Sequence, residues 1–341
     1  MSINTVYYQI AKDVTAADLA KIIGATDLYG PDQIVINDIE SFDAAKPFSL
    51  IYQSDPELAK TLVVESAVVI TNQACLPLID PANCCLIVAS PRIGFAHALA
   101  HLVTAAPVDH GTTGVSPMAE IADTATIHPS ATIMPQVVIG AGTVVEAGVV
   151  LHAGVKVGED CYIRSNSVLS HCLIGNGGDI GAGSVLGAAG FGFEMTDDGV
   201  VKLPHIGLVV IDDFVSIGSG CAIDRGSLGN THIGAHVMMD NLCHIAHNVT
   251  IGARSIIAGQ CGISGSVTVG EGVVMGGQVG IAPHVKIGDG AVLAARSGVT
   301  KDIEDGDEVA GFPAISKRQF WREQATLRRL GTPKGPNHNK Q

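Results

Sequence analysis

The apolar positions of this chain recur with a period of six over most of its length. An aliphatic residue stands at every sixth position from Ile121 to Leu169, and a longer run, with two Met among its members, extends from Ile233 to Val299. This period matches neither the 3.6-residue repeat of an amphipathic helix nor the two-residue alternation of a half-buried strand. It therefore indicates a repeat architecture.

The pattern predicts a parallel β-helix in which each group of six residues forms one short strand and one corner, with the aliphatic residue inside. Three such groups close a triangular coil of about 18 residues, and successive coils stack at about 4.8 Å, the ordinary spacing of paired strands. We expect this solenoid, which makes the protein mainly β, to span residues 119–310.

The segments that flank the repeat predict different structures. Residues 1–105 are typical of a small α/β domain, and residues 106–118, which contain Pro and Gly, are typical of a linker. The predicted strands of the small domain are 34–36, 62–64, 67–70 and 86–88, and its predicted helices are 16–24 and 93–105. Residues 311–341 predict a C-terminal helix, with Ser316 as its N-cap and Leu330 near its end, followed by a polar tail.

Composition and charge narrow the functional classes. A net charge of −13 disfavours nucleic-acid binding. Residues 311–341 nevertheless hold seven Lys or Arg and one Glu, which suits either docking of an acidic partner or an ordinary solvated helix. The N-terminus lacks a secretory pattern, no apolar run approaches the roughly 20 residues that span a membrane, and the eight Cys form no CxxC pair. We therefore expect a cytoplasmic protein with reduced thiols and no transmembrane segment.

The longest interruption of the repeat covers residues 188–205 and contains Gly190-Phe191-Gly192-Phe193. Loops that leave a regular scaffold often carry binding residues, so two aromatic residues in a chain poor in them suit a contact surface. A loop that folds back and packs its own Phe side chains explains the same pattern.

The densest polar cluster of the solenoid covers residues 240–248. His247 stands two places after an inward Ile245, close to a corner, and Gly265 occupies the same place one coil later. His284 follows two coils and one residue after His247, on the same edge. A histidine that accepts a proton and a bare N–H that stabilises an oxyanion are what acyl transfer requires. Corner histidines without any catalytic role fit the spacing as well.

These motifs carry a family resemblance. Ile223-Asp224-Arg225-Gly226, the 240–248 cluster and the 190–193 loop closely resemble UDP-3-O-acylglucosamine N-acyltransferase, an enzyme of bacterial lipid A biosynthesis, over residues 120–330. The resemblance implies a left-handed parallel β-helix and a homotrimer with active sites between subunits, preceded by a uridine-binding α/β domain. It implies no metal and no cofactor, because acyl carrier protein brings the acyl-phosphopantetheine as a substrate.

The resemblance also assigns roles to individual residues. It makes His247 the general base, Gly265 the oxyanion donor and Asp240 the residue that orients His247. Four further residues are expected to bind the UDP-amino-sugar substrate: His284, Asn241, Asn248 and Tyr52. The basic C-terminal segment becomes the expected docking site for acyl carrier protein, with Arg318, Arg322 and Arg328 as contacts.

The chain departs from the family pattern in three places. The uridine motif, a Phe, an Asn and a Tyr spaced three apart, is replaced by Tyr52, Asp55 and Leu58, of which we expect Tyr52 and Asp55 to contact the nucleotide. Ala189 replaces an acidic residue common in the aromatic loop. Gly298 stands where some relatives carry a bulky residue that limits acyl length, so a longer chain is expected to fit.

Three alternative functions stay open at this point. A related hexapeptide-repeat acyltransferase acting on another amino-sugar nucleotide accounts for the altered uridine motif. A trimeric β-helical carbonic anhydrase would hold zinc with His244, His247 and His284, although the first two occupy different places in the repeat. A solenoid that binds a sugar nucleotide without activity is the third.

Overall fold

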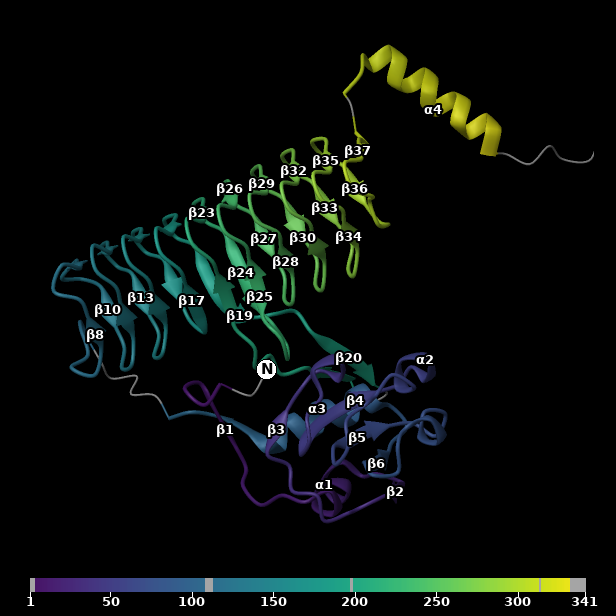
Figure 1. The fold of residues 1–341 in the computed structure, drawn as a ribbon. Coiled ribbons are helices and arrows are strands. Elements are labelled where there is room, and N and C mark those ends of the chain that lie inside the picture. Colours follow the sequence, from purple (N-terminus) through teal and green to yellow (C-terminus); the bar gives the residue numbers. More distant parts are fainter. Residues whose placement is uncertain (1–3, 108–112, 197–198, 313, 332–341) are drawn as a thin grey trace, which may run out of the picture.

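A computed structural model describes residues 4–107, 113–196, 199–312 and 314–331. Figure 1 shows a long solenoid, a smaller domain beside its middle coils, and a C-terminal helix beyond its last coil. Residues 108–112, within the predicted linker, and residues 332–341, most of the predicted polar tail, lie outside the described residues.

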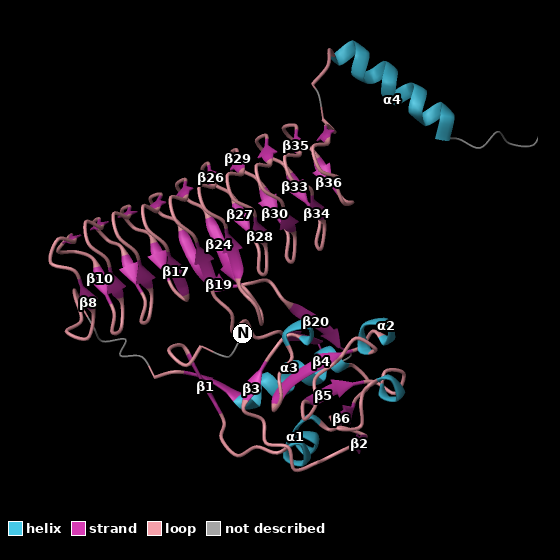
Figure 2. Cartoon of the chain, viewed as in Figure 1, coloured by secondary structure: helices cyan, strands magenta, loops and turns pink. Residues whose placement is uncertain are grey.

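The solenoid consists of very short strands arranged in three parallel sheets, as Figure 2 shows. Sheet 1 contains β10 (Thr132–Ile133), β13 (Val150–Leu151), β16 (Val168–Leu169), β19 (Val185–Ala189), β24 (Ala222–Arg225), β27 (His244–Ile245), β30 (Gly262–Ile263), β33 (Gly280–Ile281) and β36 (Gly298–Val299). Sheet 2 contains β8 (Glu120–Ile121), β11 (Val138–Ile139), β14 (Lys156–Val157), β17 (Cys172–Ile174), β22 (Val209–Ile211), β25 (Thr231–Ile233), β28 (Thr250–Ile251), β31 (Thr268–Val269) and β34 (Lys286–Ile287). Sheet 3 contains β9 (Thr126–Ile127), β12 (Val144–Val145), β15 (Tyr162–Ile163), β18 (Asp179–Ile180), β23 (Ser216–Ile217), β26 (Met238–Met239), β29 (Ile256–Ile257), β32 (Val274–Met275), β35 (Val292–Leu293) and β37 (Glu308–Val309).

The register confirms the predicted parallel β-solenoid. His244 pairs with Gly262, and Gly262 with Gly280, each 18 residues further along the chain. The aliphatic residues of the inner coils point inward and are buried, as with Ile245 and Ile263, and those of the end coils, such as Ile121 and Ile127, are partly buried against them. Each coil contributes one such residue from each of the three sheets, and burial of these residues supplies the hydrophobic free energy that holds the stack together.

Two excursions interrupt the middle coils, and the shorter one lies between β24 and β25 and contains Ser227. Residues between β19 and β22 leave the solenoid and form a hairpin of β20 (Phe193–Thr196) and β21 (Gly199–Lys202). The Arg225 guanidinium fastens the start and end of this excursion, because it donates to the carbonyls of Gly187 at 2.8 Å and His205 at 2.9 Å. Arg225 therefore holds this excursion in place.

The N-terminal domain is an α/β unit with a five-stranded sheet of order β2-β6-β5-β4-β3. Its strands are β2 (Asp27–Tyr29), β3 (Asp38–Ile39), β4 (Ser49–Gln53), β5 (Val68–Thr71) and β6 (Cys84–Ile87), with a separate pair β1 (Tyr8–Ile10) and β7 (Val103–Ala105). Its helices are α1 (Ala16–Ile23), α2 (Pro56–Ala59), α3 (Pro91–Leu102) and the 3₁₀ turns Phe42–Ala44 and Leu76–Leu78.

The sequence predicted the inner strands of this domain better than its connections. The runs at 67–70 and 86–88 correspond to β5 and β6, and the helix at 16–24 to α1. Three predictions were wrong. Residues 62–64 form no strand, because β4 and β5 pair directly and leave no place between them. Residues 34–36 make only a bridge from Val35 to Thr15, and residues 103–105 end the helix as strand β7.

The N-terminal domain packs on the solenoid through its first aromatic residues. The Tyr7 ring stacks on His171 with centroids 4.4 Å apart, and its hydroxyl donates to the Gly154 carbonyl at 2.8 Å. The Tyr8 hydroxyl donates to the His205 carbonyl at 3.0 Å. These contacts fix the domain beside the coils that carry the polar cluster.

The C-terminal helix α4 (Lys317–Gly331) follows the last coil. Its predicted N-cap is confirmed, because the Ser316 hydroxyl accepts a hydrogen bond from the Gln319 N–H at 3.2 Å. Arg322 and Arg329 follow Arg318 by four and eleven positions, a spacing that places the three side chains on one face of the helix.

Candidate active site

His247 lies just after β27, and its neighbour fixes its tautomer. The Nδ1 atom of His247 lies 3.0 Å from the Oδ1 atom of Asn248. That atom must be the amide oxygen, because it also accepts from the N–H of Ser227 at 2.9 Å. Nδ1 of a neutral His247 therefore carries the hydrogen, and its Nε2 presents a lone pair.

Asn248 is itself held firmly. Its oxygen accepts a second bond from the Ser227 hydroxyl at 2.8 Å, and its N–H donates to the Thr231 hydroxyl at 2.9 Å. The Thr231 hydroxyl in turn donates to the Asp224 carbonyl at 2.6 Å. This network joins two coils and the short excursion between them, so it orients the His247 ring within a rigid frame.

The Asp224 side chain lies close behind this network and is almost fully buried. Burial raises the pKa of its carboxyl, and the nearby imidazoles of His244 and His247 oppose that effect. The Nε2 atom of His244 lies 4.0 Å from an Asp224 oxygen.

A groove of about 540 Å³ runs along sheet 1 beside His247. Gly265 and His284 line it, as their spacing along the repeat predicts, together with His244, Phe191 and Arg92. No described residue accepts a hydrogen bond from the Gly265 N–H, which leaves that donor for a ligand. A Cβ atom on Gly265 would lie 2.8 Å from both Cε1 and Nε2 of His247. Only glycine therefore leaves room for the imidazole at this place.

Three glycines extend the groove along the outer face of sheet 1. Gly262, Gly280 and Gly298 pair in register on successive coils, and a Cβ atom on any of them would meet open space. These three positions form a glycine track, a row without side chains that leads along sheet 1 from His244 toward the C-terminal end of the solenoid.

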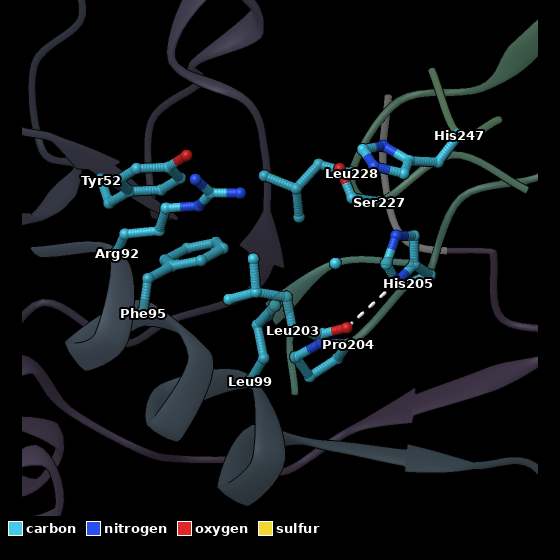
Figure 3. Close-up of a pocket in the computed structure, with 11 residues that line it drawn as sticks. Tyr52, Arg92, Phe95, Leu99, Leu203, Pro204, His205, Ser227, Leu228 and His247 are labelled. Carbon is cyan, nitrogen blue, oxygen red and sulfur yellow. Dashed lines mark hydrogen bonds between the residues drawn. The ribbon is translucent and has the colours of Figure 1, made fainter. Parts of the chain in front are cut away.

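A second, smaller cavity of about 60 Å³ joins His247 to the N-terminal domain (Figure 3). Tyr52 from β4 and Phe95 from α3 form its wall, with ring centroids 4.9 Å apart. Arg92 lines both this cavity and the groove, and its guanidinium lies 2.8 Å from Glu194 of the hairpin. The structure therefore brings Tyr52 to the predicted site.

Sequence reasoning missed Arg92, Phe95, Ser227 and His205. Phe95 and Arg92 lie in a helix whose pattern reveals only packing, and Ser227 lies in an excursion without a regular period. The signal that could have identified His205 is its place at the end of the 188–205 interruption. Its ring packs edge-to-face on His247, with centroids 5.0 Å apart.

Other predicted residues lie elsewhere in the chain. Asp240 follows β26 on another edge of the coil, and its Oδ1 atom accepts from the N–H and the side-chain amide of Asn241 at 2.7 Å each. The Asn241 oxygen accepts from the Ser219 N–H at 2.8 Å. Within one chain, Asn248 and not Asp240 orients His247. Asp55 is not among the described residues that line either cavity. Its carboxylate instead caps α2 by accepting a hydrogen bond from the Glu57 N–H at 2.8 Å.

The aromatic loop packs its own Phe side chains, which is one of the two explanations that the sequence allowed. Phe191 and Phe193 pack edge-to-face with centroids 4.9 Å apart. Phe191 nevertheless stays 84% exposed and lines the groove. Among the residues that the structure describes, no group of three or more His, Cys, Asp or Glu is arranged to hold a metal ion. None of the described helices has the length and apolar character needed to cross a membrane.

Comparison with known proteins identifies the family. The bacterial transferase hexapeptide (six repeats) family matches residues 230–265, and the GMPPB C-terminal domain family matches residues 111–194. The chain is 39% identical over 246 residues to a UDP-3-O-acylglucosamine N-acyltransferase of Caulobacter sp. (strain K31), covering 71% of this chain and 72% of that protein. The chain belongs to the UDP-3-O-acylglucosamine N-acyltransferase family. The motif resemblance is thereby confirmed, and the chain is an acyltransferase by family.

Further relatives of this acyltransferase family extend the comparison. The Pseudomonas putida (KT2440) protein of the same name is 37% identical over 69% of this chain and 68% of its own. The alignment to the Caulobacter vibrioides protein is 45% identical over 89 residues and covers only 26% of each chain. Among solved structures, LpxA from Acinetobacter baumannii is similar at 26% identity and a TM-score of 0.45, over 66% of this chain and 78% of that one.

Proposed function

We propose that this protein transfers a 3-hydroxyacyl group from acyl carrier protein to the 2-amine of UDP-3-O-acylglucosamine, with His247 as general base. The observation that carries the proposal is the Asn248 hydrogen bond, which fixes the hydrogen of His247 on Nδ1 and leaves the Nε2 lone pair beside Gly265. A neutral imidazole in this tautomer is the form that accepts a proton from an attacking amine.

The reaction follows from the placement of two groups. The amine nitrogen attacks the thioester carbonyl while Nε2 of His247 takes its proton, and the free Gly265 N–H donates to the developing oxyanion. Collapse of the tetrahedral intermediate forms the amide and breaks the C–S bond. The proton on His247 then passes to the leaving thiolate, so that the imidazole returns to its neutral state.

Two aromatic residues and one arginine next to this centre support a site for the nucleotide sugar. Tyr52 and Phe95 offer aromatic surface to a base, and Arg92 offers a cation between the two cavities. The described residues that line these cavities include no Asp or Glu, which suits a diphosphate. His284, which lines the groove on a later coil than His247, orients the sugar and acyl portions.

A homotrimer would complete the site. Asp240 and Asn241 lie on another edge of the coil, so they can act at His247 only from a second subunit. An outward apolar row on sheet 3, formed by Met238, Ile256 and Val274, is 51%, 50% and 40% exposed and suits burial against another copy. The face of α4 that carries Arg318, Arg322 and Arg329 suits docking of the acidic acyl carrier protein in the cytoplasm. The carrier protein supplies the acyl-phosphopantetheine as a substrate, so the reaction needs no bound cofactor.

A second candidate is acylation of a different amino-sugar nucleotide. The observation that favours it is the commitment of Asp55 to the cap of α2, which removes one expected nucleotide contact. Incubation with candidate UDP-amino sugars and acyl carrier proteins of several chain lengths, followed by mass analysis of products, separates the two candidates.

The test of the catalytic assignment is His247→Ala. We expect unchanged assembly by light scattering and a loss of about 10²- to 10⁴-fold in kcat, the range of a lost general base. The matched control is His128→Ala, an exposed histidine on the early coils. Undiminished turnover of His247→Ala would refute the assignment, and stoichiometric zinc with CO₂ hydration would favour the carbonic anhydrase alternative.

A further inference from the structure

His205 is a buried histidine whose protonation state the structure defines. The residue is only 4% exposed, and its Nδ1 atom lies 3.0 Å from the Leu203 carbonyl oxygen. A carbonyl only accepts, so Nδ1 carries the hydrogen and Nε2 carries a lone pair. Burial lowers the pKa of His205 to about 4, so the ring is neutral at pH 7.

The Nε2 atom of His205 has no hydrogen-bond partner among the described residues. An unpaired acceptor in a buried place costs free energy and is rare without a functional reason. Neighbouring groups hold the His205 residue in this position. Its carbonyl oxygen is held by Tyr8 and Arg225, and a Cβ atom on Gly192 would lie 2.8 Å from its Cε1 atom.

The unpaired nitrogen borders His247. Figure 3 shows the His205 ring directing it toward the His247 ring, and the two rings meet edge-to-face at 70°. A Cβ atom on Gly190 would lie 2.8 Å from both Nε2 of His205 and Cδ2 of His247, so the two atoms face one narrow space. Glycine at 190 keeps that space free of a side chain.

We propose that His205 is a positioning residue whose lone pair, held against His247, stabilises the imidazolium that forms when His247 accepts the substrate proton. This proposal rests on the proposed function, because it requires His247 to act as a base. A fixed dipole at a buried position stabilises a developing charge more strongly than mobile solvent does.

The surroundings keep His205 in the form that this role needs. The charged and titratable groups that act on it are His247, Arg225 and Lys202, and each of them opposes a positive charge on His205. The Tyr8 hydroxyl contacts only its backbone carbonyl. A protonated His205 would lose its lone pair and repel the imidazolium, so burial and these cations preserve the neutral ring.

The first test compares His205→Leu with His205→Gln. We expect His205→Leu to lower kcat about tenfold with both KM values unchanged, because the lone pair acts only on the charged state of His247. His205→Gln, whose amide oxygen can take the place of the lone pair, should recover most of kcat. The matched control is His171→Phe, which replaces a half-buried neutral histidine that packs on Tyr7 and should keep kcat.

Two kinetic results would overturn the proposal. A raised KM with unchanged kcat would make His205 a ground-state contact, and a Gln variant as slow as the Leu variant would make it a packing residue.

The second test needs no substrate. Nitrogen-15 spectra of the histidine rings at pH 7 should show a neutral His205 with its hydrogen on Nδ1, and the His247 ring signals should differ between wild type and His205→Leu. A charged His205, the opposite tautomer or identical His247 signals would overturn the proposal. A wild-type protein with the expected spectra but no acyl transfer would instead refute the proposed function.

Discussion

The Oδ1 atom of Asn248 accepts a hydrogen bond from Nδ1 of His247 at 3.0 Å, and this single contact decides which nitrogen of His247 is available as a base. Adjacent residues rarely meet in this way on a regular strand. Here they do so because Asn248 adopts a left-handed conformation, with φ of 61°, at the corner of the coil.

The Asn248 contact predicts a graded effect of substitution. Asn248→Ala removes the acceptor, so a fraction of His247 rings will carry the hydrogen on Nε2, and we expect kcat to fall about 10²-fold. Asn248→Asp retains an acceptor oxygen and should be faster than Asn248→Ala. Steady-state kinetics with both variants checks this order, and equal rates for the two would contradict the role of the tautomer.

The glycine track predicts acyl-chain length. Each coil advances about 4.8 Å, roughly the length of four methylene groups. Leu substituted at Gly262, Gly280 or Gly298 should therefore shorten the longest acyl chain accepted, most at Gly262 and least at Gly298. Product mass with carrier proteins of graded chain length provides the measurement. Gly277→Ala, whose Cβ would make only an ordinary contact at 3.4 Å, is the control. Unchanged chain-length selection in all three Leu variants would place the acyl chain elsewhere.

The helix α4 predicts a salt-dependent interaction. Arg318→Glu combined with Arg322→Glu reverses two charges on the same face, and we expect the Kd for acyl carrier protein to rise about tenfold or more at low salt. Arg329→Glu should add to this effect, because Arg329 lies on the same face. Calorimetry at two ionic strengths measures it, with Arg254→Glu and Lys286→Glu on the solenoid as a charge-matched control. Equal weakening by the control pair would attribute the effect to net charge alone.

The His171 stack predicts acid sensitivity. Burial lowers the pKa of His171 from 6.5 to about 3, so the unfolded chain binds more protons between these values. The free energy of unfolding must therefore fall as pH falls from about 6.5 toward 3. His171→Phe keeps an aromatic ring on Tyr7 and should make this decline less steep. Denaturant unfolding at several pH values checks the prediction, and parallel curves for wild type and variant would contradict it.

The sequence by itself determined the solenoid, because the inward position of every coil must be apolar and three repeats must close one turn. For the same reason the 18-residue spacing of the coils was enough to predict that His247, Gly265 and His284 line one groove. Periodicity is a local property, and a local property suffices where each coil contacts only its neighbours.

Tertiary structure alone decided the rest of the site. Tyr52, Phe95 and Arg92 share a cavity with His247 although they belong to a domain without any repeat, because Tyr7 and Tyr8 dock that domain on the solenoid, which no spacing encodes. His205 returns from an irregular excursion, and Asn248 replaces Asp240 as the partner of His247 because a corner residue turns toward its neighbour. Such contacts depend on how distant surfaces pack and on which hydrogen bonds remain unfilled, and the order of residues states neither.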